Sequence, residues 1–225
     1  MFESLLVANR GEIARRVLRT AAAMGIRTIA VHSEADVGMP FVKEADEAIL
    51  IGPAAPAESY LDIAKVLEAA ARTGAEAIHP GYGFLAESPE FAAAVVDAGI
   101  GWVGPSAESM RSMGDKISAR NLMATAGVPV APGTTEPVAD VEAAVVAARD
   151  IGYPLMVKAS AGGGGIGMGV ARDEEQLRAA FETARTRAER FFGSPSILLE
   201  RHIEGARHVE VQVLGLGDGP VVALG

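Results

Sequence analysis

Short apolar runs alternate with helical patterns over the first hundred residues. The apolar runs predict five short strands, at 5–8, 28–32, 48–51, 75–79 and 100–103. Apolar residues at helical spacing predict a helix that contains Ile13 and Val17 and ends at Gly25. Ser59 is predicted to cap a helix that runs through Ala71, with Gly74 beyond its end. Ser88-Pro89 is predicted to begin a helix that Gly99 closes. This order predicts an α/β fold with a parallel, doubly wound sheet.

A second pattern follows Gly104-Pro105. Two helical stretches cover 107–126, and three prolines and one glycine in 128–137 predict a linker. Beyond it, a smaller α/β unit is predicted from a helix capped by Asp140, a strand at 155–158, a helix at 173–192 and a strand at 197–200. Asp173 and Gln176 have the spacing of a capping box at the start of the long helix.

The last twenty residues have the period of a β-hairpin. His208, Glu210 and Gln212 alternate with valines, and a turn near Asp218-Gly219 leads into a second strand at 220–224. We therefore predict three parts, at 1–127, 128–205 and 206–225. Because the hairpin ends without a further strand, we expect it to open a truncated domain.

Composition narrows the class of protein. The chain has 225 residues, of which 49% are apolar and 22% charged, as in a globular protein. There is no cysteine, no apolar stretch of membrane-spanning length and no signal-peptide pattern at the N-terminus. We therefore expect a cytoplasmic protein. The net charge of −9 argues against a nucleic acid or an anionic membrane as partner.

The most informative segment begins at Lys158. Six of the eleven residues after this lysine are glycine. Backbone without Cβ atoms approaches an anion closely, and a lysine at a strand end adds a charge suited to phosphate. The segment therefore predicts a nucleotide triphosphate site under a flexible flap. The alternative is a glycine-rich linker, which its position between a strand and a capped helix disfavours.

Two common nucleotide sites are excluded. The first strand is followed by Asn9-Arg10-Gly11-Glu12, with one glycine where the dinucleotide fingerprint needs three. No glycine-bounded loop ends in lysine followed by serine or threonine, so a P-loop is absent.

Other polar segments have two interpretations each. The loop at 79–88 follows a strand, where ligands gather in open α/β sheets, and contains His79, Tyr82 and Glu87. It is also consistent with a structured turn. Lys116 fits a phosphate or a solvated surface. The backbone of 200–203 is consistent with an adenine-binding segment or with a plain strand end. His208 is consistent with a nucleotide contact or with the polar face of a hairpin.

Taken together and in order, these segments resemble biotin carboxylase. The resemblance rests on ANRGEIA (8–14), HPGYGFLAES (79–88), MGDK (113–116), GYPLMVKAS (152–160), the glycine loop and RHVEVQV (207–213). Biotin carboxylase is the ATP-grasp component of biotin-dependent carboxylases. The resemblance implies a preATP-grasp domain, an ATP-grasp lid and the start of a C-terminal α+β domain.

The resemblance also implies a reaction. ATP phosphorylates bicarbonate to carboxyphosphate, which breaks down to carbon dioxide beside biotin, and the N1′ atom of biotin takes the carboxyl group. The biotin is carried on a partner protein or domain, and a carboxyltransferase uses the product, as in an acyl-CoA carboxylase of fatty acid biosynthesis. Mg²⁺ is implied as a cofactor, with its ligands expected downstream of Gly225.

Residue roles follow by position. The resemblance places Lys116 and Lys158 at the ATP phosphates, Met168 near the base and His208 near the ribose. The glycines that would close over the phosphates are Gly163, Gly164, Gly165 and Gly167. Glu200, Arg201 and Ile203 would bind the adenine. Tyr82 and His79 of the same loop are predicted to be catalytic residues in the biotin and bicarbonate pocket, and Arg16 is predicted to lie near the interface of a homodimer.

The chain departs from the family in two respects. The family loop usually carries a lysine or arginine where this chain has Ile166, so we expect weaker ATP binding or slower turnover. The catalytic carboxylates and arginine of the family lie downstream of Gly225, so we expect this chain alone to be inactive. Two alternatives stay open: an ATP-grasp ligase for another acceptor, such as pyruvate or urea, and a non-catalytic nucleotide-binding or assembly module.

Overall fold

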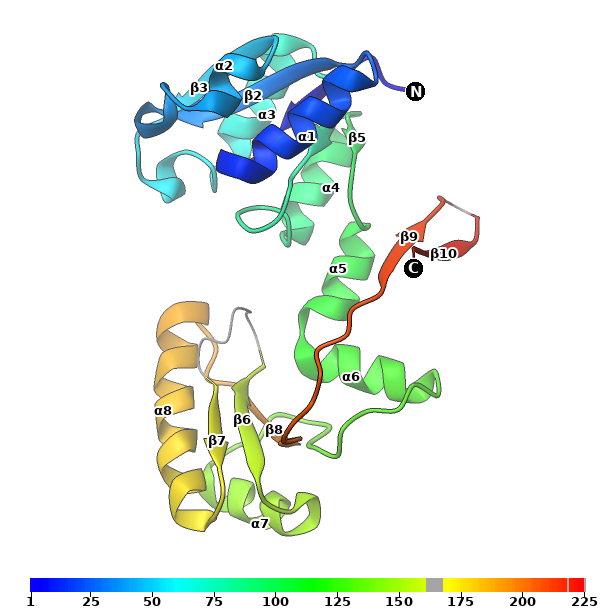
Figure 1. The fold of residues 1–225 in the computed structure, drawn as a ribbon. Coiled ribbons are helices and arrows are strands. Elements are labelled where there is room, and N and C mark those ends of the chain that lie inside the picture. The colour runs from blue at the N-terminus through cyan, green and yellow to red at the C-terminus, as the bar shows by residue number, and fades with distance from the viewer. Residues whose placement is uncertain (161–167, 218, 225) are drawn as a thin grey trace. The chain divides into compact units, whose positions relative to one another are not determined.

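The computed structural model describes residues 1–160, 168–217 and 219–224. The chain divides into two compact units, Met1–Arg111 and Ser112–Gly225. Each unit contains a sheet of its own (Figure 1). Each also has its own buried hydrophobic residues. The division into three parts stays a prediction.

The first unit alternates strands and helices along the chain. Its elements are β1 (Ser4–Val7), α1 (Gly11–Ala23), β2 (Arg27–Ser33), the 3-10 helix η1 (Glu34–Asp36), α2 (Pro40–Glu44), β3 (Glu47–Gly52), the 3-10 helix η2 (Pro56–Glu58), α3 (Ile63–Thr73), β4 (Ala77–His79), α4 (Pro89–Asp97), β5 (Gly101–Trp102) and α5 (Ala107–Gly114), which reaches into the second unit.

The five strands form a parallel sheet in the order β3-β2-β1-β4-β5. Alternate residues of β1 enter different cores because successive side chains of a strand point to opposite faces. Leu5 and Val7 pack with α1 and α2, whereas Leu6 packs with α3 and α4. Helices therefore cover both faces, and the predicted doubly wound α/β sheet is confirmed.

One predicted cap in this unit is wrong. Ser59 does not begin α3, because its hydroxyl donates to the carbonyl of Ala55 at the 3-10 turn η2. Asp62 is the N-cap instead, and its carboxylate accepts from the backbone N–H of Lys65 at 3.2 Å. A tight turn over residues 56–62 therefore delays the helix by almost one turn. Gly74 ends α3 in the left-handed conformation, as predicted.

The second unit contains a small three-stranded sheet with two helices on one face, together with a further helix and a two-stranded hairpin. Its elements are α6 (Lys116–Thr125), α7 (Val141–Ile151), β6 (Leu155–Ala159), β7 (Gly169–Ala171), α8 (Glu174–Phe192), β8 (Ile197–Arg201), β9 (Gln212–Gly215) and β10 (Val221–Leu224). The three-stranded sheet is antiparallel in the order β7-β6-β8, and β7 was not predicted.

Alternation along β6 separates the core from the charged face. Leu155, Val157 and Ala159 pack with the apolar sides of α7 and α8. Lys158 therefore points to the opposite face of the sheet. This arrangement is what places the predicted phosphate-binding lysine outside the core.

Part of the predicted linker pairs with the edge strand β8. The carbonyl of Pro132 accepts from the backbone N–H of Arg201 at 2.7 Å, and Thr134 and Val138 donate to β8 at 2.9 and 2.8 Å. This segment satisfies backbone groups on the outer edge of β8, which would otherwise be unpaired.

The predicted hairpin is present but shorter. β9 and β10 pair antiparallel, with Gln212 opposite Leu224. Residues 206–211 are not in a strand, so His208 and Glu210 precede the hairpin although they continue its alternation. Asp218 of the predicted turn lies outside the described residues.

Candidate functional site

The second unit brings Lys116 and Lys158 to the same end of β6. The ammonium group of Lys116 donates to the carbonyl of Ala159 at 3.1 Å, and its backbone N–H donates to Ser160 at 3.3 Å. Ala159 is the residue after Lys158 and the last of β6. Both cations therefore lie where the chain enters the glycine loop.

Asp115 and Ser160 fix the start of α6 at this strand end. One carboxylate oxygen of Asp115 accepts from the backbone N–H of Ser118 at 2.8 Å, and the other accepts from the hydroxyl of Ser160. Burial opposes ionisation of Asp115, but the hydrogen bonds from Ser160 and Ser118 outweigh it and lower the pKa of this carboxyl. A charged aspartate thus caps the helix and places Lys116 in its first turn.

The environment of Lys116 favours binding of an anion. Burial lowers the pKa of Lys116, and the positive charge of Lys158 lowers it further. Two ammonium groups held close together repel one another, and a bound phosphate would relieve that repulsion.

Glu200 joins Lys158 to Arg120. Glu200 lies opposite Met156 in the sheet, two positions from Lys158, and its carboxylate accepts from the Lys158 ammonium. The other carboxylate oxygen lies 3.7 Å from the Arg120 guanidinium. The Arg120 side chain is 11% exposed and also donates to the carbonyl of Ala131. The site therefore holds three cations and two carboxylates.

The predicted adenine-binding residues lie at the end of β8. The backbone N–H of Arg201 is bonded to Pro132, and its guanidinium lies 3.3 Å from the carbonyl of Ile151. The Ile203 side chain is 59% exposed beyond the strand. His208 lies further along and contacts Glu210 at 3.0 Å. The structure thus brings Glu200 to Lys158 and leaves Ile203 accessible.

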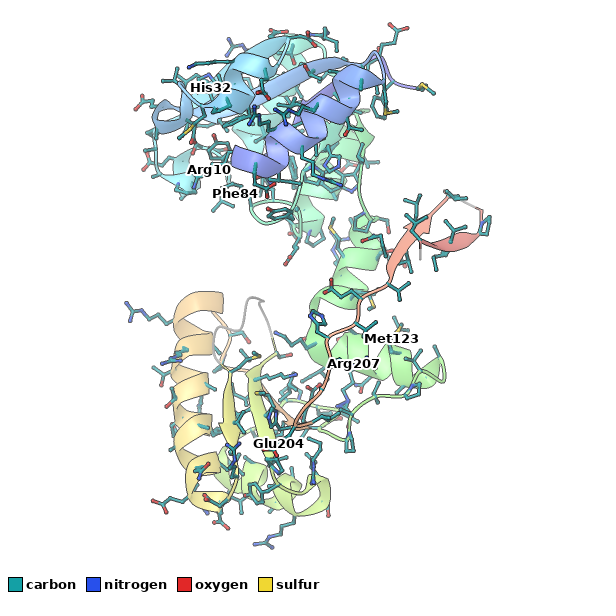
Figure 2. The ribbon with its side chains drawn as sticks, viewed as in Figure 1. Arg10, His32, Phe84, Met123, Glu204 and Arg207 are labelled. Carbon is teal, nitrogen blue, oxygen red and sulfur yellow. The ribbon has the colours of Figure 1, made fainter. Side chains whose placement is uncertain are left out.

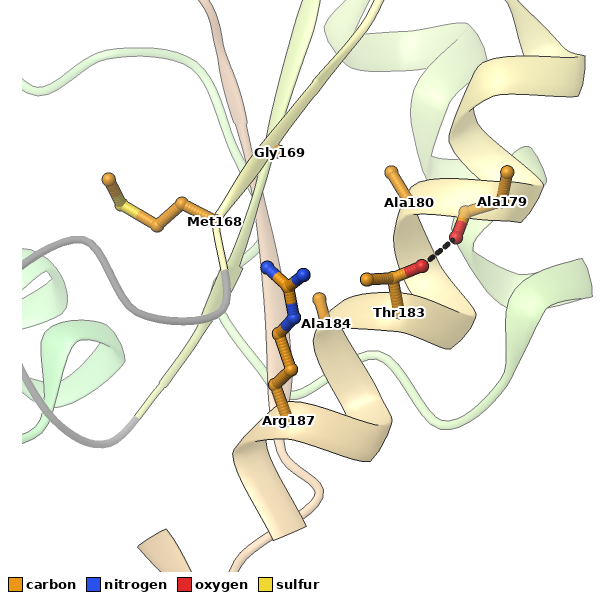
Figure 3. A pocket seen from close by; sticks show the side chains of 7 residues that line it. All are labelled: Met168, Gly169, Ala179, Ala180, Thr183, Ala184 and Arg187. Atoms are coloured by element: carbon orange, nitrogen blue, oxygen red, sulfur yellow. Dashed lines mark hydrogen bonds between the residues drawn. The ribbon is translucent and has the colours of Figure 1, made fainter. Parts of the chain in front are cut away.

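Met168 lies just before β7, the strand at the opposite edge of the small sheet from β8. It borders a shallow pocket of about 200 Å³ between β7 and α8, together with Thr183, Arg187 and the alanines of the helix (Figure 3). The four predicted phosphate-closing glycines and Ile166 lie outside the described residues.

In the first unit, the 79–88 loop is held by residues that follow β1. β1 and β4 are neighbours, and Val7 pairs with His79, so the segments after the two strands meet at one edge of the sheet. The side-chain amide of Asn9 donates to the carbonyls of Pro80 and Tyr82, each at 2.8 Å. The phenol of Tyr82 donates to the carboxylate of Glu12 in the first turn of α1.

Arg10 contacts the same loop through an aromatic pair. Its guanidinium lies 5.6 Å from the ring centre of Phe84 (Figure 2). It lies 5.7 Å from the ring centre of Tyr60, and the two rings stack at 5.1 Å. Asp36 accepts from Arg10 at 3.4 Å and from the Tyr60 hydroxyl at 2.8 Å. The loop is therefore packed and bonded from the β1 side.

The two loop residues predicted to be catalytic differ in environment. The Tyr82 side chain is exposed, and its hydrogen bond to Glu12 raises its pKa. His79 is partly buried, and burial together with the charge of Arg16 lowers its pKa. The Nδ1 atom of His79 accepts from the backbone N–H of Gly81 at 2.9 Å, so this nitrogen carries no proton.

Sequence reasoning missed two residues of these sites, Arg120 and Asn9. Asn9 directly follows a strand at the edge where ligands gather, which is a signal that could have identified it. Arg120 has no such signal, because an arginine within a helix is usually solvated and only the fold shows it beside Glu200.

Metal clusters and membrane-spanning helices are both absent from the described residues. Within the described ranges, no group of three or more histidine, aspartate or glutamate side chains could hold a metal ion. No helix among those residues is long and apolar enough to cross a membrane.

Comparison with known proteins matches both units. Residues 1–110 match the family described as biotin carboxylase, N-terminal domain, and residues 115–225 match carbamoyl-phosphate synthase L chain, ATP binding domain. A biotin carboxylase of Halalkalibacterium halodurans is 53% identical over 224 residues, which cover 100% of this chain and 50% of the relative. The chain spans about half the length of the curated biotin carboxylases that it matches.

Solved structures agree with these matches. The biotin carboxylase of Campylobacter jejuni, in a β,γ-ATP complex, has a TM-score of 0.96 and 45% identity over 99% of this chain and 50% of that one. The biotin carboxylase domain dimer of 2-oxoglutarate carboxylase from Hydrogenobacter thermophilus, with MgADP, ADP and bicarbonate, has a TM-score of 0.95 and 46% identity over 100% of this chain and 49% of that one. With both units matched and the ATP-grasp architecture in place, this chain belongs to the biotin carboxylase family.

Proposed function

We propose that the enzyme containing this chain carboxylates biotin with ATP and bicarbonate. In this reaction the γ-phosphoryl group of ATP passes to bicarbonate and ADP leaves. The resulting carboxyphosphate breaks down to carbon dioxide and phosphate. N1′ of biotin then loses its proton to the phosphate and bonds to the carbon dioxide. The Hydrogenobacter relative was solved with MgADP and bicarbonate, which supports this pair of substrates.

One observation carries the proposal: two lysines converge where β6 enters the glycine loop. Lys116 is held there through Ala159 and Ser160, next to Lys158. Transfer of a phosphoryl group depends mainly on positioning and on neutralising negative charge. Two ammonium groups beside a glycine loop meet that requirement.

The described residues fit ATP. Lys116 and Lys158 would hold its phosphates, the backbone of 200–203 would hold its adenine, and Met168 would pack against the base. ATP supplies the phosphoryl group, while this chain orients it and balances its charge. Glu200 keeps Lys158 in place through its carboxylate, because an unpaired lysine on a flexible stem would sample many rotamers.

The described residues do not offer a complete magnesium site. The carboxylates that would hold Mg²⁺ are therefore proposed to lie in the part of the relatives that this chain does not span.

The first test measures ATP binding to the 225-residue chain by calorimetry. Lys158→Gln should weaken binding by about tenfold or more, because it removes one of two converging cations. Lys43→Gln, on the exposed surface of α2, removes the same charge and should leave binding unchanged. Equal affinities of the two variants, or no binding by the unmodified chain, would contradict the proposal.

The second test uses an enzyme completed over the full length of its relatives. ATP hydrolysis should depend on both bicarbonate and biotin. ATP binding without such hydrolysis would favour a nucleotide-binding module, and hydrolysis stimulated by another acceptor would favour a different ligase.

The partners follow from the same proposal. A biotin carrier protein or domain would present the biotin, and a carboxyltransferase would use the carboxylated product in the cytoplasm. The Hydrogenobacter domain is a dimer, and we propose a homodimer here with Arg16 near its interface.

A further inference from the structure

We propose that Asn9 is a positioning residue for the 79–88 loop, which sets the backbone at Pro80 and Tyr82 and thereby the hydrogen bonding of the His79 imidazole. The role of this loop toward biotin rests on the proposed biotin carboxylase function. The positioning of the loop by Asn9 does not depend on that function.

Both N–H groups of the Asn9 side-chain amide donate to the loop. Asn9 is 3% exposed, and its amide uses one hydrogen for the carbonyl of Pro80 and the other for the carbonyl of Tyr82, at 2.8 Å each. Its oxygen accepts from the backbone N–H of Arg10 at 2.8 Å. The opposite orientation of the amide would set its oxygen against two carbonyls, so only this one is stable.

Gly81 packs directly onto this amide. It has a φ of +68°, and a Cβ atom there would lie 2.7 Å from the Asn9 nitrogen. The backbone of Gly81 therefore lies against Asn9, because the residues on either side of it, Pro80 and Tyr82, both accept hydrogen bonds from the Asn9 amide. A glycine is needed here both for the conformation and for the close approach.

The placement of Gly81 extends to His79. The Gly81 N–H donates to Nδ1 of His79 at 2.9 Å, so the neutral imidazole carries its proton on Nε2. Charged groups that face this loop include Arg16, which acts on His79, Glu12, which accepts from Tyr82, and Arg10, which lies over the Phe84 ring. Release of the loop by loss of the Asn9 amide should therefore free Nδ1.

The test is ¹⁵N NMR of the 225-residue chain with and without Asn9→Asp. The chain has four histidines, so the His79 imidazole signals can be assigned by substitution. A carboxylate has the same shape but cannot donate, and it would repel the two carbonyls. We expect hydrogen exchange of the Gly81 amide to accelerate about tenfold or more. We also expect the ¹⁵N chemical shift of His79 Nδ1 to move to that of an imidazole nitrogen that no longer accepts a hydrogen bond.

Asn121→Asp is the matched control. The Asn121 amide also donates to a backbone carbonyl, that of Thr135 at 2.8 Å, but in the second unit. It should leave the His79 signals unchanged. A folded Asn9→Asp chain with a lower melting temperature but unchanged His79 and Gly81 signals would show a merely structural role and overturn the proposal.

A measurement on the unmodified chain covers the case in which Asn9→Asp does not fold. Through-hydrogen-bond couplings should join the Asn9 side-chain nitrogen to the carbonyl carbons of Pro80 and Tyr82, and their absence would overturn the proposal. Neither readout involves ATP or biotin, so failure of the carboxylation assay would leave this inference standing.

Discussion

At the scale of single residues, Asp36 shows how a buried charge is maintained. Its carboxylate is 6% exposed and accepts from Ser33 at 2.7 Å and from Tyr60 at 2.8 Å, with Arg10 nearby. Burial raises its pKa, but these hydrogen bonds and the Arg10 charge outweigh burial, so the net pKa lies below the ordinary 3.8. Through Tyr60 and Arg10, this carboxylate supports the aromatic contacts of the 79–88 loop.

Asp36→Asn should lower the free energy of unfolding of the first unit by about 2 kcal/mol at pH 7. The folded pKa is depressed, so the contribution of the charge is present above pH 3.8 and is lost as the pH falls through the folded pKa. The difference between wild type and variant in urea unfolding should therefore shrink from pH 7 to pH 3. Glu68→Gln, on the exposed side of α3, should leave stability within about 0.5 kcal/mol. A difference that is constant with pH would contradict this assignment.

At the scale of elements, the caps explain why the helices begin where they do. Asp140, Asp115 and Asp173 each accept from a backbone N–H three residues later, at 2.8 Å in every case. At α8 the amide of Gln176 also donates to Asp173 at 2.9 Å, and its oxygen accepts from the N–H of Arg172. The predicted capping box is therefore present with one difference. The Gln176 side chain accepts from the backbone N–H of Arg172, the residue before the N-cap, and not from that of the N-cap residue Asp173.

Asp173→Ala should destabilise the second unit by about 1 kcal/mol, because the first turn of α8 loses its acceptor. α8 packs Leu177 and Phe181 on the small sheet, so fraying at its start loosens the core beside β7. Urea unfolding measures the change, and Glu182→Ala on the exposed face of the same helix serves as the control. Equal stability of the two variants would contradict a capping role.

At the scale of the whole molecule, each hydrophobic cluster of the described residues belongs to one unit. Phe91 lies in a core of the first unit and Phe181 in the core of the second, and both are fully buried. We therefore expect each unit to unfold cooperatively on its own.

Phe91→Ala and Phe181→Ala should each cost about 3–5 kcal/mol in the unit that contains the substitution. Hydrogen exchange should accelerate in that unit and stay unchanged in the other, so each variant is the control for its partner. Accelerated exchange throughout the chain in either variant would show a single cooperative unit instead.

Much of this architecture was predictable because it depends on local patterns. The strands, the Ser88-Pro89 start of α4 and the caps of α7 and α8 follow from apolar period and from side chains that bond to nearby backbone. The Ser59 cap failed because its hydroxyl donates to the carbonyl of Ala55 and its backbone N–H donates to the carbonyl of Pro56, which hold Ser59 in the η2 turn. β7 was missed because three residues at the end of a glycine-rich run carry no period.

The sequence by itself determined the order of strands and helices, the lysine before the glycine loop and the family, since these depend on residue types and near neighbours. Only the tertiary structure decided which residues act together. Asn9 reaches carbonyls 71 and 73 positions away, Ser160 reaches Asp115 across 45, and Glu200 reaches Lys158 across 42. The physical reason is that strand pairing and register, which are set by packing of the whole sheet, bring such distant groups within hydrogen-bonding distance.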